Sequence, residues 1–325
     1  MKQEHRPVVT VTRRLPAPVE RALLERFDAR LNADDTPLDA EALREALRVS
    51  DAVLCAVSDR MDAEVLAAEP LRTQLLANFG VGFEHIDLAT ARRRDIAVTN
   101  TPGVLTDDTA DLAIALMLMA IRRLGEGERE LRAGAWRGWY PTHHLGRRLS
   151  GKALGIVGMG RIGRAVARRA VHGFGMRLHY ASRTPLPAGE AAALDAVPMD
   201  IDRVFAESDV VSLHVPSNEE TRHLVDARRL RLMPPHGILV NTARGDVVDE
   251  AALAEAVRDG TIAGAGLDVY ADEPRVHPAL LALEQVVLLP HLGSATVESR
   301  TAMGMRAFEN LVAWSEGRAL PDRVE

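Results

Sequence analysis

The chain has 325 residues, of which 47% are hydrophobic and 26% charged, a balance that excludes a fibrous or wholly disordered protein. The formal net charge of −6 disfavours a general nucleic-acid-binding protein, which would carry an excess of basic residues. The one cysteine, Cys55, excludes an intramolecular disulfide and a thiol-rich metal site.

In the first hundred residues, short apolar or β-branched segments alternate with helical patterns. The predicted strands are 8–11, 52–57, 74–78 and 97–99, and the helices between them are 18–27, 40–47 and 63–68. This alternation implies parallel strands joined by crossover helices. The polar residues 1–7 are not followed by an apolar signal-peptide core, so we expect a cytoplasmic protein.

The middle of the chain is predicted to hold one long helix over residues 106–124, after the pair Pro102-Gly103. Its apolar run, 112–121, is too short to cross a bilayer, so no membrane association is expected. Because this run is apolar on every side, the helix should lie between domains or subunits. Residues 134–151, which include two tryptophans, match neither a helix nor a strand.

A second alternating series follows, and it ends in an amphipathic helix. Its predicted strands are 153–157, 177–180, 210–215, 238–241, 264–269 and 286–289, and the final helix is 294–316. Two such series predict an α/β protein with two doubly wound parallel-sheet domains.

A glycine-rich loop joins the first strand of the second series to a helical pattern. Its three glycines have the G-x-G-x-x-G spacing: Gly158 for the tight turn, Gly160 for close approach of a pyrophosphate, and Gly163 for close packing of helix and strand. The first N–H groups of the helix would face that pyrophosphate. We therefore predict that these glycines, with Arg161 and Ile162, bind a dinucleotide.

Five segments, in this order, carry a resemblance to a known family: 78–87, the glycine loop, 240–246, 272–274 and 289–295. The chain resembles the D-isomer-specific 2-hydroxyacid dehydrogenases, and within them the glyoxylate/hydroxypyruvate reductases. The resemblance implies a Rossmann NAD(P)-binding domain, residues 103–291, inserted into a flavodoxin-like substrate domain made of 1–102 and 292–325. It also implies reduction of a small 2-oxo acid to a 2-hydroxy acid by hydride transfer from a nicotinamide cofactor.

Three residues are the candidate catalytic set. His291 follows a predicted strand, and the resemblance casts it as the proton donor, a task suited to an imidazole near neutral pH. Glu273 would stabilise the charged imidazole and fix its tautomer. Without the resemblance, a Glu-Pro pair indicates a solvated acid in a turn, and the family pattern reverses that interpretation. Arg244 lies after the strand 238–241, where its guanidinium can bind a 2-oxo acid and polarise the carbonyl.

Other candidates depend more heavily on the resemblance. It implies that the backbone N–H groups of Val81 and Gly82 bind the substrate carboxylate, although the segment could be a structural turn. It also implies that Asp268 contacts the nicotinamide end of the cofactor. Further candidates are Thr242 and Ser294 as weaker cofactor contacts, and Trp139 as a residue that reaches the neighbouring subunit's substrate pocket or packs in a dimer interface.

The cofactor preference is predicted from the end of the second strand of this domain. Related NAD enzymes carry an aspartate at the position of Ala181, where it bonds the adenosine ribose. The next residues, Ser182, Arg183 and Thr184, offer two hydroxyls and a guanidinium, which suit a 2′-phosphate. We predict NADP(H) over NAD(H), with NAD(H) still possible; the alternative is that Arg183 points into solvent.

Two other functions fit the same pattern less well. One is a dehydrogenase of this family that takes a larger 2-hydroxy acid or another hydride donor. The other is a nucleotide-sensing corepressor, but an acidic chain without an added DNA-binding segment disfavours it. We expect a homodimer that binds a small-molecule 2-oxo or 2-hydroxy acid, with no metal, nucleic-acid or membrane partner.

Overall fold

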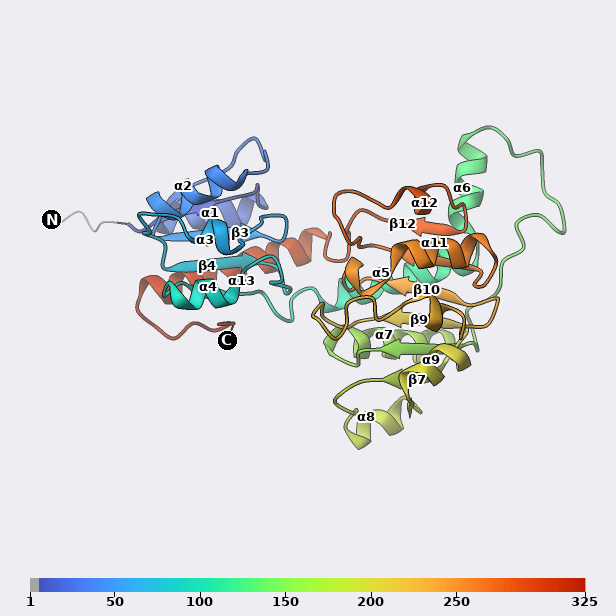
Figure 1. Cartoon of the computed structure of the whole chain (residues 1–325). Helices are drawn as coiled ribbons and strands as arrows, with labels where there is room; N and C mark the ends of the chain where they lie inside the picture. The colour runs from blue at the N-terminus through green and yellow to red at the C-terminus, as the bar shows by residue number, and fades with distance from the viewer. Residues whose placement is uncertain (1–5, 325) are drawn as a thin grey trace. The chain divides into compact units, whose positions relative to one another are not determined.

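The computed structural model describes residues 6–324, which form two compact units (Figure 1). Among the described residues, the first unit is 6–105 with 295–324, and the second is Thr106–Ser294. Each boundary between them lies three residues beyond the one predicted from the sequence.

The first unit is built on a five-stranded parallel sheet. Its strands are β1 (Val8–Val11), β2 (Asp28–Arg30), β3 (Ala52–Ala56), β4 (Leu75–Phe79) and β5 (Ala97–Thr99). Their order, β2-β1-β3-β4-β5, is that of flavodoxin. The edge strand β2 was not predicted, because its residues Asp28-Ala29-Arg30 are mostly charged and exposed.

Helices cover both faces of this sheet. One face packs on α1 (Ala17–Arg26) and α13 (Val297–Ser315), and the other on α2 (Ala40–Val49), α3 (Ala63–Leu66) and α4 (Leu88–Arg93). The chain's last helix thus completes the core formed by its first hundred residues: Met303, Ala307 and Leu311 of α13 are buried against that sheet. The short helix α4 was not predicted.

The second unit contains a seven-stranded parallel sheet. Its strands are β6 (Ala153–Val157), β7 (Arg177–Ala181), β8 (Val197–Pro198), β9 (Val210–Leu213), β10 (Ile238–Asn241), β11 (Gly264–Leu267) and β12 (Val286–Leu288). The order β12-β11-β10-β9-β6-β7-β8 reverses direction at β6, as in the Rossmann fold. Six of the seven strands were predicted, with ends within two residues.

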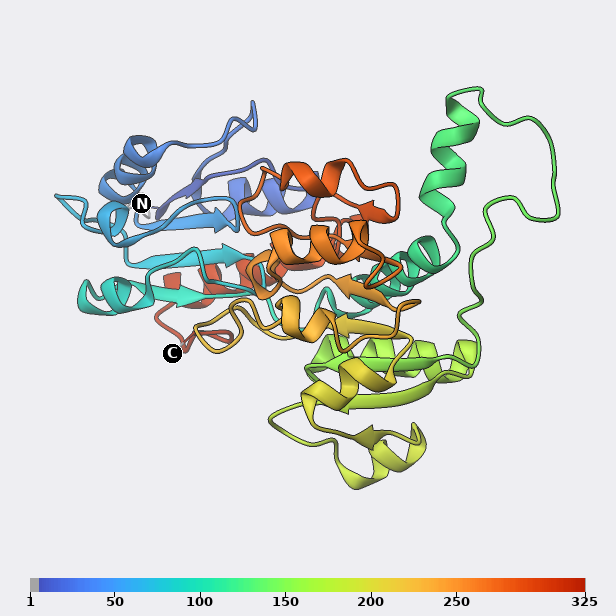
Figure 2. The same cartoon turned by 45° about the vertical axis from the view of Figure 1, so that its right-hand side comes forward.

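The faces of the second sheet are covered in the same way (Figure 2). On one face lie α5 (Thr106–Ile121) and α7 (Arg161–Phe174). The opposite face packs on α9 (Ile201–Glu207), α10 (Ala227–Leu230), α11 (Glu250–Arg258) and α12 (Pro278–Leu281), while α8 (Ala188–Ala193) lies between β7 and β8 in the chain. No helix in residues 6–324 is long and apolar enough to span a membrane.

The prediction of a single helix over 106–124 is wrong at its end. Arg123 adopts a left-handed backbone conformation, φ 56°, which terminates α5, and α6 (Leu124–Arg132) begins at the next residue. The guanidinium of Arg123 is fixed there by a two-bond ion pair with the buried Glu126. Residues 134–151 contain neither helix nor strand, as predicted.

Candidate active site

Apart from Trp139, the candidate residues of the second unit lie directly after β6, β7, β10, β11 and β12, in the loops or in the first turn of α7. Because all strands of this sheet are parallel, these loops share the carboxyl edge, where α/β proteins bind ligands. The topology therefore brings together segments that are more than a hundred residues apart in the chain.

The glycine loop has the geometry of a dinucleotide site. Gly158 has φ 96°, and a Cβ there would lie 2.5 Å from the carbonyl oxygen of His214. A Cβ on Gly163 would lie 2.2 Å from the Gly158 oxygen, so helix and loop need both glycines. A Cβ on Gly160, by contrast, would meet no atom within 4 Å, which leaves open space at the N-terminus of α7.

The predicted coenzyme-discriminating residues lie beside this loop. The Gly158 N–H donates to the carbonyl of Ala181, the last residue of β7, so Ser182, Arg183 and Thr184 start next to the glycine turn. The Arg183 side chain is 80% exposed, and its Nη1 lies 3.7 Å from Oε2 of Glu220.

One polar atom at this edge is buried without a partner. Thr242 directly follows β10, and its Oγ1 has no hydrogen-bond partner among the described residues. A buried hydroxyl in that state calls for a ligand or an ordered water. With the open space at Gly160, this fits a dinucleotide along the carboxyl edge; Thr242 was only a weak candidate in the sequence.

The turn that carries Arg244 is fixed by buried groups. The Asn241 side chain donates to the Arg244 carbonyl at 2.8 Å and accepts from the Ala243 N–H at 3.0 Å. A Cβ on Gly245 would lie 1.8 Å from the carbonyl carbon of Tyr270, so this turn packs backbone to backbone on the segment that leads to Glu273. The charge of Arg244 is close enough to favour the ionised form of Glu273.

Glu273 and His291 form a direct pair. Nδ1 of His291 lies 2.7 Å from Oε2 of Glu273, and the other carboxylate oxygen accepts the Tyr270 N–H at 3.0 Å. Burial alone would raise the pKa of Glu273, but the hydrogen bond and charge of His291, the Tyr270 amide and the charge of Arg244 together lower it. An ionised carboxylate only accepts, so Nδ1 carries the hydrogen, and Nε2 has no partner among the described residues.

The buried Asp268 positions the histidine loop. Its two oxygens accept the N–H groups of Leu292 at 2.6 Å and Gly293 at 2.8 Å, and its carbonyl accepts the His291 N–H at 2.8 Å. Burial raises the pKa of Asp268, although the hydrogen bonds from these amides act to lower it. The three bonds hold His291 at φ 54°, a strained conformation for a residue other than glycine.

In the first unit, the loop after β4 carries Val81 and Gly82. The buried Asn78 side chain donates to the carbonyls of Gly80 and Gly82, and Asn100 donates to the Val81 carbonyl. The N–H groups of Val81 and Gly82 meet no acceptor within the described residues. Successive N–H groups of this kind can bind a carboxylate.

Taken by themselves, these groups offer a polarised imidazole, a guanidinium and a dinucleotide loop. The family profile described as "D-isomer specific 2-hydroxyacid dehydrogenase, NAD binding domain" matches residues 114–293. A glyoxylate reductase of Thermococcus onnurineus is 45% identical over 323 residues, which cover 98% of this chain and 96% of that protein. The chain belongs to the D-isomer-specific 2-hydroxyacid dehydrogenase family.

Solved structures agree with this assignment. A protein from Thermus thermophilus superposes with a TM-score of 0.90 at 42% identity, covering 98% of this chain and 100% of that chain. An NADPH-dependent glyoxylate/hydroxypyruvate reductase from Sinorhizobium meliloti, in complex with NADP and malonate, gives a TM-score of 0.86 at 36% identity, with 98% and 97% covered. This dehydrogenase is an NAD(P)-dependent oxidoreductase that acts on CH–OH groups.

Not every predicted site residue of the dehydrogenase lies at this edge. Trp139 is 80% exposed in the irregular segment after α6, which projects from the second unit (Figure 2). The base of that segment, at Leu145 and Gly146, lies near Ile238 and Ala263, where β10 and β11 begin. The segment that carries Trp139 therefore leaves the unit at the amino edge of the sheet, opposite the carboxyl edge where Arg244 lies. A role for Trp139 in a substrate pocket would require a second copy of the chain.

The residues that support the site were not predicted from the sequence. Asn78 and Asn241 fix the two loops through side-chain bonds to backbone groups, and Tyr270 holds the end of β12 by donating to the Leu289 carbonyl at 2.8 Å. A buried Asn at the end of a strand is the one signal that would have indicated such a role.

Proposed function

We propose that this dehydrogenase reduces small 2-oxo acids such as glyoxylate and hydroxypyruvate to 2-hydroxy acids, with His291 as the proton donor and NADPH as the preferred cofactor. The activities for which these relatives are named support the substrate class. The observation that carries the chemistry is the 2.7 Å contact between His291 Nδ1 and Glu273 Oε2, which leaves Nε2 for the substrate.

Reduction of a carbonyl needs a hydride at carbon and a proton at oxygen. When bound, the nicotinamide cofactor supplies the hydride. His291 supplies the proton from Nε2, and the ionised Glu273 stabilises the imidazolium before transfer. The strained turn at His291, fixed by Asp268, keeps the ring in one orientation through the reaction.

The substrate carboxylate and carbonyl are bound by two further groups in this proposal. Arg244 binds the 2-oxo acid through its planar fork and draws electron density from the carbonyl oxygen. The N–H groups of Val81 and Gly82 bind the carboxylate. The carbonyls of these residues accept hydrogen bonds from the Asn100 and Asn78 side chains, which fix the loop. Thr242, Asp268 and Ser294 remain the proposed neighbours of the nicotinamide half of the cofactor.

The pyrophosphate and the adenosine half of the cofactor are bound at the start of α7 and in the loop after β7 in this proposal. The N–H groups of Arg161, Ile162 and Gly163 at the start of α7 face the pyrophosphate. Ser182, Arg183 and Thr184 take the 2′-phosphate of the adenosine ribose, where no carboxylate of β7 would repel it.

Substrate choice is tested by steady-state kinetics of the full chain with NADPH. We expect turnover of glyoxylate and hydroxypyruvate, with kcat/KM at least about tenfold above that of an aromatic 2-oxo acid, because one methylene of misfit already changes discrimination by roughly 10-fold or more. Preference for the aromatic acid would replace this proposal with the larger-substrate alternative. Absence of turnover with any 2-oxo acid would favour a binding protein.

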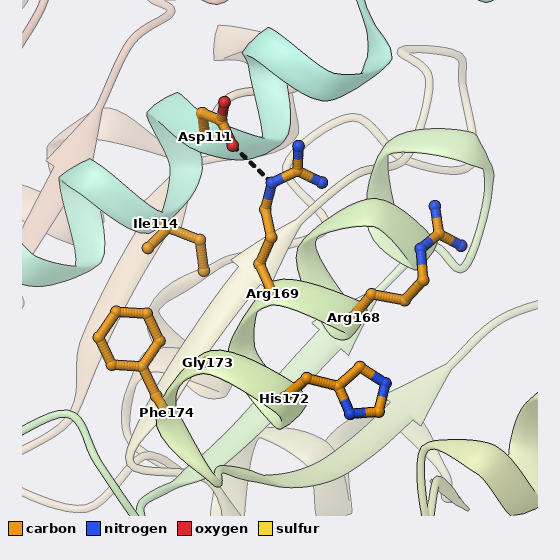
Figure 3. Close-up of a pocket in the computed structure, with 7 residues that line it drawn as sticks. All are labelled: Asp111, Ile114, Arg168, Arg169, His172, Gly173 and Phe174. Carbon is orange, nitrogen blue, oxygen red and sulfur yellow. Dashed lines mark hydrogen bonds and ion pairs between the residues drawn. The ribbon is translucent and has the colours of Figure 1, made fainter.

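We further propose that two copies associate. The irregular segment after α6 exposes apolar side chains: Trp136, Trp139, Tyr140 and Leu145. A pocket of about 440 Å³ between α5 and α7, lined by Ile114 and Phe174 beside the Asp111–Arg169 ion pair, offers a receiving surface on the same unit (Figure 3). Exposed aromatic groups and apolar hollows of this kind are typical of subunit contacts.

Sedimentation equilibrium at micromolar concentration is expected to give the mass of two chains. Trp139→Ala with Leu145→Ala removes large apolar groups from the segment and should shift the equilibrium toward one chain. Leu281→Ala, which truncates an exposed leucine of α12, is the matched control and should leave the mass unchanged. A mass of one chain for the unmodified protein would refute association.

A further inference from the structure

A cluster of ligating side chains lies outside the catalytic edge. Glu130 of α6 and the consecutive residues His143 and His144 place one ligand atom each within 4.8 Å of the others. Nε2 of His143 is 2.8 Å, and Nε2 of His144 2.9 Å, from the same Glu130 oxygen, Oε2. The three side chains are only 23–30% exposed, so they are largely shielded from solvent.

The local backbone brings two neighbouring imidazoles to one side. Successive side chains of an extended segment point in opposite directions. Here the His143 N–H closes a turn onto the Tyr140 carbonyl, and His144 adopts a left-handed conformation with φ 43°. The ring centroids of the two histidines are consequently 4.2 Å apart, and both Nε2 atoms converge on Glu130.

A second carboxylate lies behind one of the histidines. Nδ1 of His144 is 4.0 Å from Oε2 of Glu126. The Glu126 side chain is 9% exposed, and its carboxylate accepts hydrogen bonds from Nε and Nη2 of Arg123. Metal-binding histidines commonly use one ring nitrogen for the metal and orient the other toward a carboxylate. His144 has this arrangement, with Nε2 toward the cluster and Nδ1 toward Glu126.

We propose that Glu130, His143 and His144 form a binding site for a divalent transition-metal ion of the Zn²⁺ type. Two imidazoles and one carboxylate suit Zn²⁺ and its neighbours, whereas Ca²⁺ and Mg²⁺ prefer oxygen ligands alone. Small outward rotations of the three side chains would place their ligand atoms around one ion, with water at a fourth position. We predicted no metal site from the sequence, and this proposal departs from that prediction.

The ion would connect α6 to a segment that has no helix or strand of its own. Residues 134–151 run from the end of α6 to β6, and His143 and His144 lie near their middle. A bond from this segment to Glu130 closes a loop, so the binding free energy would stabilise the ordered arrangement of the segment. The role is structural and separate from the reaction at His291.

Isothermal titration of EDTA-treated, full-length protein with Zn²⁺ tests the proposal. We expect one Zn²⁺ per chain at this cluster, and an affinity lower by about 100-fold or more in the His143→Ala/His144→Ala variant, since loss of even an outer-shell partner costs about 10- to 100-fold. The control, His223→Ala, removes an exposed histidine of the same unit and should bind Zn²⁺ as the unmodified protein does.

Two further measurements keep the test independent of folding. Glu130→Gln preserves the shape of the side chain but removes the charge, and it should weaken Zn²⁺ binding at least about tenfold. Zn²⁺ should also slow proteolytic cleavage within residues 134–151 in the control but not in the double variant. The proposal is overturned if the double variant binds Zn²⁺ as tightly as the control, or if His291→Ala alone abolishes the binding.

Discussion

Replacing His291 with alanine is expected to lower kcat for glyoxylate reduction by about 100-fold or more, the usual contribution of a positioned general acid. The hydride would still reach the carbonyl carbon, but the oxygen would have to take its proton from water. NADPH affinity should change little, because the hydrogen bond of the ring among the described residues is to Glu273 and not to a group of the dinucleotide loop. The measurement is steady-state kcat together with the dissociation constant of NADPH.

His291→Asn provides a second form of this experiment. Asparagine tolerates the left-handed backbone that His291 adopts at φ 54°, so this variant loses the acid without adding strain. His223→Asn, at an exposed histidine that also has a left-handed backbone (φ 49°), is the control and should retain full activity. Near-normal kcat in a folded His291 variant would remove the residue from the proton-donor role.

Replacing Arg183 with alanine is expected to weaken NADPH binding by about 10-fold or more and NADH binding far less. A hydrogen bond between charged groups contributes on the order of 1.5–3 kcal/mol, or about 10- to 150-fold. Because the side chain is 80% exposed, salt screening places the effect near the lower limit of that range. The loss should therefore be larger in dilute buffer than in high salt.

Removing the carboxylate that pairs with Arg183 should have the opposite effect on NADPH binding. Glu220 lies 3.7 Å from the Arg183 guanidinium and would compete with a 2′-phosphate for it. Glu220→Gln should therefore strengthen NADPH binding while leaving NADH binding nearly unchanged. Arg177→Ala, an exposed arginine at the other end of β7, is the matched control. Equal kcat/KM for NADPH and NADH in the unmodified enzyme would show that this loop does not discriminate.

The parts of the site that depend on local pattern could be predicted from the sequence. The strand Ala153–Val157 and the three glycines form one continuous signal, and the structure shows why two of the glycines, Gly158 and Gly163, tolerate no side chain. The pairing of Glu273 with His291 could be expected only through the family resemblance. Nothing in the spacing of the two residues indicates that a loop and a strand end meet at 2.7 Å.

The supporting contacts could not be predicted, because they join side chains to the backbone of distant segments. The sequence predicted Asp268 only as a contact of the nicotinamide, and its hydrogen bonds to the amides 24 and 25 residues later in the chain were not predicted. The end of α5 was missed for a related reason. Arg123 is an ordinary helix former, so its residue type does not indicate the left-handed turn that separates α5 from α6, where its side chain pairs with Glu126.

The pairing of Glu273 with His291 is the central claim, and the pH profile of kcat for the unmodified enzyme and for Glu273→Gln tests it most directly. Reduction requires a protonated imidazole, so the rate should fall as the pH rises. Because an amide stabilises the imidazolium less than an ionised carboxylate does, kcat should be lower in Glu273→Gln at every pH. Superimposable profiles for the two proteins would contradict the account.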